Sequence, residues 1–97
     1  MDEQKKLRGG SLIARALNDK GIENVFTLSG GFCNPALEGF MECQMSVINC
    51  PHEQIAGHLA DGHTRITRKP SVCLVGPEGF ANAVPSMMEA WGERSPV

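Results

Sequence analysis

One acidic residue of this 97-residue chain stands where it could exchange a proton with a ligand. Glu53 opens a segment whose apolar residues recur at helical spacing, and it follows an apolar stretch at 45–48 that we expect to form a buried strand. Open α/β sheets bind their ligands at the carboxyl ends of the strands, so a carboxyl group at this junction could act as a general acid or base. A simpler explanation stands beside this one, because the helix dipole alone favours a glutamate in the first helical turn.

Histidines and cysteines offer a second kind of chemistry, which their spacing disfavours. A zinc-binding H-E-x-x-H motif that began at His52 would need a histidine where Ala56 stands, and His58 and His63 face different sides of a helix. The four cysteines include no C-x-x-C pair, so we expect reduced thiols and neither a disulfide framework nor a zinc site. We therefore predict no metal ligand in this chain.

The segments that must position Glu53 alternate between apolar strands and amphipathic helices. We expect strands at 24–28, 46–49 and 71–75, and helices that begin at Ser11, at Asn34, near His52 and near Phe80. Ser11 and Asn34 are the expected N-caps of their helices, and Gly21 is the expected stop of the first. Three strands that alternate with four helices predict an α/β fold, an open parallel sheet with helices on both faces, doubly wound and incomplete.

Two apolar stripes give the later helices their expected orientation. The stripe after His52 consists of Ile55, Ala56, Leu59, Ala60 and Ile66, and we expect it to pack on the sheet. The stripe of the last helix consists of Phe80, Val84, Met87, Met88 and Trp91, and Met87, Met88 and Trp91 are expected in a core or an interface. Pro85 interrupts this stripe, so the helix should begin later or be kinked there.

The two ends of the chain carry weaker signals. Residues 1–10 are polar and end in two glycines, and we expect a flexible lead-in before a domain at 11–97. Residues 94–97 look like the start of another strand, so the domain is expected to be only partly present. The net charge of −2, with acidic and basic residues interspersed, gives no electrostatic reason for binding nucleic acid or an acidic membrane. Without a long apolar segment or an Arg-rich leader, a cytoplasmic location is the expectation.

Residues 52–65, HEQIAGHLADGHTR, resemble the RHEQ-x-A-x-H-x-A-D-G-x-x-R segment of the acetolactate synthase-like enzymes that depend on thiamine diphosphate. The resemblance extends from Gly9 to Val97 and implies the N-terminal pyrimidine-binding (Pyr) domain of such an enzyme. It also implies that Glu53 is catalytic and hydrogen-bonds the N1′ nitrogen of the cofactor's aminopyrimidine ring. A carboxyl group that shares a proton with N1′ favours the imino tautomer of the ring, which is the internal base of these enzymes.

Two glycine-containing loops carry further parts of the resemblance. The segment 25–35 is similar to the family loop that lies beside the thiazolium ring and the substrate, and the segment 76–82 is similar to the GPG-x-x-N loop close to the pyrimidine. The residues that the resemblance assigns to cofactor binding are Glu53, Gly30, Gly31, Gly76, Pro77, Gly79 and Asn82.

Three residues depart from the family pattern. Glu78 stands in the middle of the second glycine loop, Ser29 stands where proline is common, and His63 stands where tyrosine is common. Glu78 matters most for the chemistry. A second carboxylate that faced the same pocket as Glu53 would raise one of the two pKa values and disturb the sharing of a proton.

The resemblance implies that much of the active site lies outside this chain. The family holds the diphosphate and Mg²⁺ in a separate C-terminal domain with a GDG…N motif, which this chain lacks. The family's site also lies between the Pyr domain of one subunit and the diphosphate-binding domain of another, so we expect a homo-oligomeric parent and no activity from this chain alone. The parent would be a transferase or lyase that decarboxylates and ligates 2-oxo acids or cleaves a related C–C bond. Its substrate and any binding of FAD stay open.

A second interpretation belongs to a different class of protein. The chain could be a stand-alone, non-catalytic Pyr-like module that binds or regulates a separate partner subunit. A natural stop codon after Val97 together with co-purification of a partner would favour this module, and a reading frame that continues into a GDG…N domain would favour the enzyme.

Overall fold

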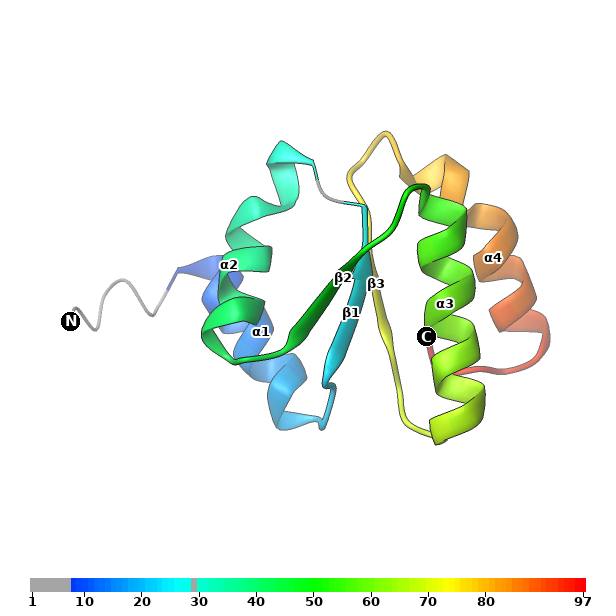
Figure 1. The fold of residues 1–97 in the computed structure, drawn as a ribbon, viewed down its shortest axis with the longest axis horizontal. Helices are drawn as coiled ribbons and strands as arrows, with labels where there is room; N and C mark the ends of the chain where they lie inside the picture. Colours follow the sequence, from blue (N-terminus) through cyan, green and yellow to red (C-terminus); the bar gives the residue numbers. More distant parts are fainter. Residues whose placement is uncertain (1–7, 29) are drawn as a thin grey trace.

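The computed structural model describes residues 8–28 and 30–97 (Figure 1). Its elements are, in chain order, α1 (Gly9–Asp19), β1 (Asn24–Thr27), the short 3₁₀ helix η2 (Gly31–Cys33), α2 (Asn34–Glu42), β2 (Ser46–Asn49), α3 (Glu53–Thr67), β3 (Val72–Leu74) and α4 (Phe80–Gly92). Each strand lies where the sequence predicts it, to within one residue at either end. None of the helices in the described ranges has the length and apolar content that crossing a bilayer requires.

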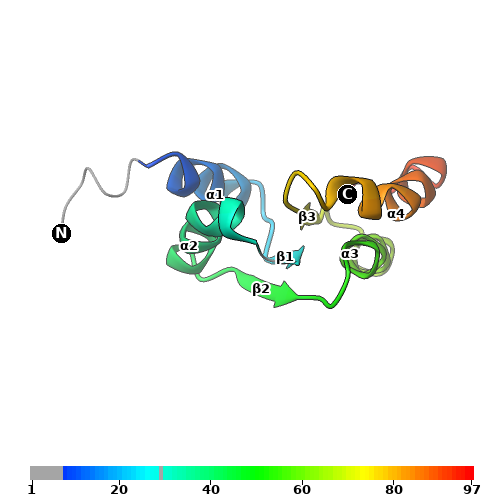
Figure 2. The same ribbon diagram turned by 90° about the horizontal axis from the view of Figure 1, so that it is seen from above.

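The sheet is small and entirely parallel. Its strand order is β2-β1-β3, so β1 is the central strand, and Phe26 of β1 lies opposite Ile48 of β2 and Cys73 of β3. Helices α1 and α2 lie to one side of the sheet, and α3 and α4 lie to the other (Figures 1 and 2). This arrangement confirms the predicted fold class, an open parallel α/β sheet with helices on both faces.

The strand order also brings two diverging loops to one edge of the sheet. β1 and β3 are neighbours, although β2 lies between them in sequence. The chain leaves the carboxyl end of β1 toward α2 and the carboxyl end of β3 toward α4, so the two loops run to opposite faces (Figure 1). Below this point Thr27 Oγ1 donates a hydrogen bond of 2.7 Å to the carbonyl of Leu74, which ties the two strand ends together. The place where two neighbouring strands send their connections to opposite faces of the sheet is a topological switch point. Open α/β sheets bind ligands at such switch points.

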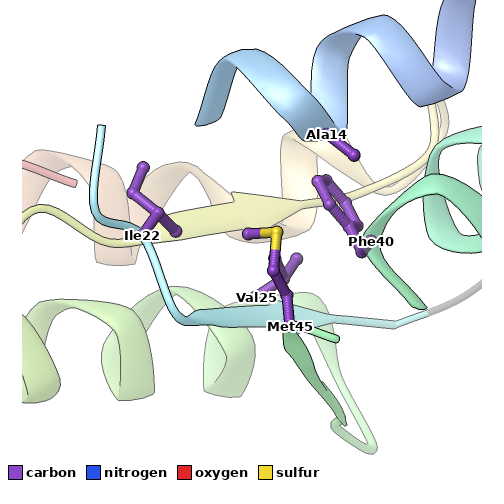
Figure 3. Packing of buried hydrophobic residues seen from close by; sticks show 5 residues of the cluster. All are labelled: Ala14, Ile22, Val25, Phe40 and Met45. Carbon is purple, nitrogen blue, oxygen red and sulfur yellow. The ribbon is translucent and has the colours of Figure 1, made fainter. Parts of the chain in front are cut away.

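Two small cores fill the space between the sheet and its helices. The core under α1 and α2 consists of Ala14, Ile22, Val25, Phe40 and Met45 (Figure 3). The core under α3 consists of Phe26, Cys50, Ala56 and Ala60, with Cys73 packed against it. All four cysteines are free thiols. Burial raises the pKa of the Cys73 thiol, as expected of a cysteine that behaves as a small apolar residue.

The expected lead-in at 1–10 needs correction at its end. Residues 1–7 lie outside the described part of the chain, but Gly9 and Gly10 belong to α1, which begins before the predicted start at Ser11. The reason is the close crossing of α1 and α2, since a Cβ atom at Gly10 would collide with the backbone carbonyl of Pro35. Gly10 therefore serves helix packing, whereas a Cβ atom at Gly9 would meet nothing within 4 Å, and α1 begins two residues earlier than the sequence suggested.

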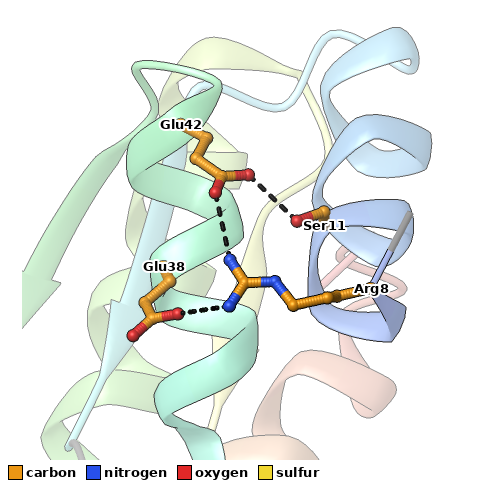
Figure 4. Close-up of polar contacts among 4 residues, drawn as sticks. All are labelled: Arg8, Ser11, Glu38 and Glu42. Carbon is orange, nitrogen blue, oxygen red and sulfur yellow. Dashed lines mark hydrogen bonds and ion pairs between the residues drawn. The ribbon is translucent and has the colours of Figure 1, made fainter. Parts of the chain in front are cut away.

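The predicted N-cap at Ser11 is also wrong. Arg8 is the N-cap residue of α1, and the buried Ser11 hydroxyl donates a 2.9 Å hydrogen bond to Glu42 of α2. Arg8 bridges Glu38 and Glu42, with N–O distances of 3.2 Å to each (Figure 4). These contacts hold α1 against α2, although exposed ion pairs of this kind contribute only about 0–1 kcal/mol each.

The ends of α1 and α2 give one confirmed prediction and one error. Gly21 follows the C-cap of α1 with φ +86°, a conformation that glycine adopts at little cost, so its predicted role as the stop is confirmed. Asn34 is not an N-cap, because its backbone is already helical (φ −56°, ψ −42°) and Cys33 holds the cap position. The one-turn helix η2 runs directly into α2, which moves the cap by one residue.

The predicted apolar stripes of α3 and α4 pack inward only in part. In α3 only Ala56 and Ala60 of the stripe are buried, whereas Ile66 is 84% exposed. In α4 Trp91 is 82% exposed, and the buried positions are small residues. Ala56 and Ala60 pack in the core with Phe26 and Cys50. The buried Ser86 of α4 lies against Gly57 of α3, a close approach that leaves no room for large side chains at this point. Pro85 does not delay the start of α4, which begins at Phe80 and contains the proline.

Gly57 marks the closest approach of α3 and α4. A Cβ atom at this position would collide with Ser86 Oγ of α4 and would lie 2.7 Å from Ser86 Cβ. Ser86 is fully buried, and its hydroxyl donates 2.7 Å to the carbonyl of Ala83, so it cannot turn away without losing this bond. The contact therefore fixes the spacing between the two helices.

An ion-pair cluster supports the same helix pair. Arg65 donates to both carboxylate oxygens of Asp61 at 3.0 and 2.9 Å and also pairs with Glu89 of α4 at 3.2 Å. Residues four apart face each other on a helix, so Asp61 and Arg65 are suited to pair, and Asp61 is buried at only 4% exposure. The hydrogen bond from Arg65 holds the pKa of the Asp61 carboxyl below its ordinary value.

Two strand predictions differ from the structure in detail. β2 is an edge strand of the described sheet and is largely exposed, so the expectation that it is buried is wrong. Residues 95–97 form no strand, although the Ser71 amide donates a 3.1 Å hydrogen bond to the Pro96 carbonyl. The last residues of the chain therefore lie beside the start of β3 without a ladder of paired residues.

The contact at Gly57 leads to a stability prediction with a control in the same helix. We expect Gly57→Ala to lower the free energy of unfolding by about 1–3 kcal/mol, because the new methyl group has no space against Ser86. Gly62→Ala should instead raise it by about 0.5–1 kcal/mol, because a Cβ atom there meets nothing within 4 Å and alanine favours the helix. Urea unfolding followed by circular dichroism measures both, and equal effects of the two substitutions would contradict the packing.

Candidate functional site

Glu53 is the first residue of α3, and its position is fixed from both sides. Before it, the Cys50 amide donates to the Thr27 carbonyl at 2.7 Å, which holds the end of β2 against β1. At the helix start, His52 is the N-cap residue, with extended backbone, and its Nδ1 accepts a 3.0 Å hydrogen bond from the Gln54 amide. The helix therefore starts directly after the carboxyl end of β2, as the sequence predicts.

The Glu53 carboxyl lies against the turn that follows β3. Asn82 Nδ2 donates a 3.1 Å hydrogen bond to Glu53 Oε1. A Cβ atom at Gly79 would collide with Glu53 Oε2 and would lie 2.8 Å from the carboxyl carbon. The missing side chain of Gly79 thus leaves the space that the Glu53 carboxyl occupies.

The turn after β3 is a compact unit with its own hydrogen bonds. The Gly79 amide donates to the Gly76 carbonyl at 3.1 Å, the Phe80 amide to the Pro77 carbonyl at 3.4 Å, and the Asn82 amide to the Gly79 carbonyl at 3.1 Å. Asn82 lies in the first turn of α4. The residues that resemblance assigns to the pyrimidine loop therefore form one structure, and Glu53 touches it.

Gly30 and Gly31 belong to the connection from β1 to α2, which leaves the same edge of the sheet toward the opposite face from the turn after β3 (Figure 1). Gly30 accepts a 3.0 Å hydrogen bond from the Cys33 amide at the start of η2. A Cβ atom at either glycine would meet nothing within 4 Å, so the space beside both is open and Glu53 does not occupy it. Ser29, between this loop and β1, lies outside the described residues. The structure therefore brings Glu53, Gly79 and Asn82 together and leaves Gly30 and Gly31 apart from them.

Hydrogen bonds set the acidity of Glu53. Its own backbone N–H is the main cause that holds the pKa of the carboxyl below its ordinary value, followed by the Asn82 amide. Partial burial acts in the opposite direction, and His52 would add a lowering effect when its imidazole is protonated. The side chain is partly exposed, so the ionised carboxylate can reach a ligand at this edge.

Glu78 does not have the effect that its place in the loop suggested. The Glu78 side chain is exposed and turns back toward Gly76, with Oε1 3.5 Å from where a Cβ atom of Gly76 would lie. The pKa of Glu53 is lowered, whereas a facing carboxylate would raise it.

His52 was not expected at the site from its residue type. The usual N-cap residues are serine, threonine, aspartate and asparagine, so the sequence gives no standard capping signal before Glu53. The signal that could have identified the cap is the imidazole nitrogen, which can accept a backbone hydrogen bond at this position.

Of the other two histidines, His63 packs inside the fold and His58 is exposed. His63 Nε2 lies 3.3 Å from Asn24 Nδ2, and its ring packs at 5.7 Å from the ring of Phe26. Within residues 8–28 and 30–97, no three His, Cys, Asp or Glu side chains gather in a way that could hold a metal ion.

Comparison with known proteins decides the family. Residues 7–97 match the family described as thiamine pyrophosphate enzyme, N-terminal TPP binding domain. The chain belongs to this family. Thiamine pyrophosphate, also called thiamine diphosphate, is therefore the cofactor that this domain implies. The predicted family is confirmed over nearly the whole chain.

Curated relatives of this N-terminal TPP binding domain include several enzymes. The chain is 38% identical over 92 residues to the acetolactate synthase large subunit of Mycobacterium tuberculosis, which covers 94% of this chain and 17% of the relative. It is 32% identical over 99 residues to a probable 2-ketoarginine decarboxylase of Pseudomonas aeruginosa, covering 100% of this chain and 18% of the relative. A 2-hydroxyacyl-CoA lyase 2 of Caenorhabditis elegans is 30% identical over 99 residues, covering 100% of this chain and 15% of the relative. The chain thus spans less than a fifth of the length of these relatives.

The close contact at Gly79 leads to a prediction about the carboxyl. Gly79→Ala should move the Glu53 carboxyl and break its hydrogen bond to Asn82, because the new methyl group takes the same space. Its backbone φ of −80° suits alanine, so we expect the free energy of unfolding to fall by less than about 1 kcal/mol. The side-chain amide resonances of Asn82, followed by ¹⁵N NMR, report the hydrogen bond.

Gly76→Ala is the matched control in the same turn. A Cβ atom there has ordinary contact distances, with Glu78 Oε1 at 3.5 Å. In the Gly76→Ala variant, the side-chain amide resonances of Asn82 should match those of the unaltered chain. Unchanged Asn82 resonances in Gly79→Ala would contradict the placement of the Glu53 carboxyl.

Proposed function

We propose that this chain supplies the aminopyrimidine-binding half of a thiamine diphosphate site, with Glu53 as the proton-sharing carboxyl group. The observation that carries the proposal is the contact of the Glu53 carboxylate with Gly79 and Asn82, at the carboxyl edge of a parallel sheet. Membership in the thiamine pyrophosphate enzyme family supplies the identity of the cofactor. The glycines at 30 and 31 would leave the backbone open to the ring system from the other side of the switch point.

The residues present are suited to the heterocyclic end of the cofactor. Glu53 offers an ionised, partly exposed oxygen that can accept a hydrogen bond from a protonated ring nitrogen. The glycine turn behind it presents backbone without side chains, so a planar ring can approach closely. Bound thiamine diphosphate supplies a nucleophilic carbon and an electron sink for making or breaking C–C bonds beside a carbonyl group. Glu53 would hold a proton at the ring nitrogen and so favour the basic tautomer of the aminopyrimidine.

The diphosphate and Mg²⁺ would be held by a partner. The described residues contain no cluster of metal ligands, so these groups need a diphosphate-binding domain from a second subunit or a separate polypeptide. Phe80, Met88 and Trp91 of α4 are 62%, 64% and 82% exposed, and such an apolar stripe is suited to contact with a partner. We infer a homo-oligomeric parent in which two subunits complete each site, and the exposed apolar residues of α4 support this inference.

The reaction class follows from what the relatives share. The names of the relatives include an acetolactate synthase, a probable 2-ketoarginine decarboxylase and a 2-hydroxyacyl-CoA lyase. We infer that the parent enzyme decarboxylates and ligates 2-oxo acids or cleaves a related C–C bond. Its activity would therefore be that of a transferase or a lyase.

A chimera tests the role of Glu53. The 97-residue chain would replace the matching segment of the Mycobacterium tuberculosis acetolactate synthase large subunit, which supplies the missing length. We expect Glu53→Gln to lower kcat for pyruvate by about 10²–10⁴-fold, because glutamine cannot share a proton. Glu23→Gln, an exposed glutamate before β1, is the control and should leave kcat unchanged.

The outcome of this experiment separates the two interpretations. Near-normal turnover by the Glu53→Gln chimera would contradict the proposed role of this carboxyl. If the chimera with the unaltered chain folds and assembles but never turns over pyruvate, the non-catalytic Pyr-like module becomes the better explanation.

The isolated chain is predicted to be inactive. With thiamine diphosphate, Mg²⁺ and pyruvate present, we expect no acetolactate or acetaldehyde from the pure 97-residue chain, because it supplies only one half of the site. A coupled or colorimetric product assay is the measurement, with the chimera as the positive control. Turnover by the pure chain would show that the site is complete without a partner.

A further inference from the structure

We propose that Asn82 is a positioning residue that fixes the conformation and the charge of Glu53 before any heterocycle binds. The inference rests on the proposed function, since it assigns a task to Asn82 at the same site. It adds a second element to the proton chemistry, because Asn82 belongs to α4 and Glu53 to α3.

The two oxygens of the Glu53 carboxyl have different surroundings. Oε1 accepts the 3.1 Å hydrogen bond from Asn82 Nδ2, and Oε2 lies against the backbone of Gly79. The carboxyl therefore cannot rotate freely, because one side is bound to a donor and the other side is limited by the turn. The amide nitrogen of asparagine can only donate, so this contact stabilises the acceptor form, which is the ionised carboxylate.

Few other charges face this carboxyl. On α3 the neighbouring titratable group is His52, whose imidazole would lower the pKa of Glu53 when protonated. On the turn after β3 the charged residue is Glu78, which turns back toward Gly76. The first turn of α4 has no acidic residue. Among the side chains in these elements, the neutral amide of Asn82 is therefore the strongest influence on the charge of Glu53.

This arrangement has a consequence for proton sharing. A carboxylate with a fixed donor on one oxygen keeps its other oxygen for a ligand, so a ring N–H could bind without first reorienting the side chain. The donor also makes Glu53 a stronger acid, so the proton rests more on the ring nitrogen than on the carboxyl. Asn82 would thus bias the shared proton toward the ligand.

The test is a pH titration of the Glu53 side-chain carboxyl by ¹³C NMR in the 97-residue chain. In the unaltered chain we expect a midpoint below the ordinary glutamate range. Asn82→Ala should shift the midpoint upward because the donor is lost, and Asn82→Asp should shift it further because a like charge replaces the donor. Asn18→Ala, at an exposed position of α1, is the matched control and should leave the midpoint where it is.

Two outcomes would overturn the inference. One is the same Glu53 midpoint in Asn82→Ala as in the unaltered chain. The other is a pH-independent Asn82 side-chain amide in the unaltered chain, a measurement that does not depend on the folding of any variant. There, the Asn82 side-chain N–H resonances must change with the same midpoint as the Glu53 carboxyl, and a pH-independent Asn82 would show that the two groups are not coupled.

The titration uses no cofactor, so its result is independent of the chimera experiment. If Asn82→Ala leaves the titration midpoint of Glu53 unchanged while Glu53→Gln abolishes turnover in the chimera, only the positioning role of Asn82 fails. If Asn82→Ala shifts the titration midpoint of Glu53 while the Glu53→Gln chimera keeps full turnover, the proposed function fails. The role of Asn82 in catalysis then fails with it. A purely structural Asn82 would change the stability of the chain but not the acidity of Glu53.

Discussion

The position of Glu53 depends on the close packing of α3 against α4. Gly57 lies against Ser86 at the narrowest point between the two helices, and the ion pairs of Arg65 support the same interface farther along α3. Both helices start at the carboxyl edge of the sheet, so their packing brings the first residue of one beside the first turn of the other (Figure 1). Glu53 and Asn82 meet for this reason, although they follow different strands. The geometry of the site is therefore a consequence of helix spacing.

The same packing explains why several large apolar side chains of α3 and α4 are exposed to solvent. Because α3 and α4 use alanine, glycine and serine against each other, their large side chains, such as Ile66 and Trp91, point away from the interface. A small sheet covered by two thin cores cannot bury them within these 97 residues. A partner that covers this surface would also be the natural source of the diphosphate and metal site, so the incomplete core and the incomplete site have a single explanation under the proposed function.

Local patterns in the sequence predicted the elements and the family, while long-range packing decided the rest. The alternation of strands and helices, and the motif at 52–65, gave the fold class, the start of α3 and the family. The apolar stripe of α3 correctly placed Ala56 and Ala60 in the core, but the large residues Ile66 of α3 and Trp91 of α4 are exposed, because periodicity does not show which part of a stripe meets a close-packed neighbour. The turn at 76–79 was predicted as a loop, but its contact with Glu53 joins residues far apart in sequence, and only the structure reveals the hydrogen bond.

The central claim is that the Glu53 carboxyl touches the heterocycle of the cofactor. The most direct test adds thiamine diphosphate at millimolar concentration to the isotope-labelled chain and follows the Glu53 carboxyl by ¹³C NMR together with the Gly79 and Asn82 amides by ¹⁵N NMR. The account predicts that these three resonances shift together on addition of the cofactor, and that Glu53→Gln removes the shifts at Gly79 and Asn82. Perturbation confined to other parts of the chain, with the Glu53, Gly79 and Asn82 signals unmoved, would contradict it.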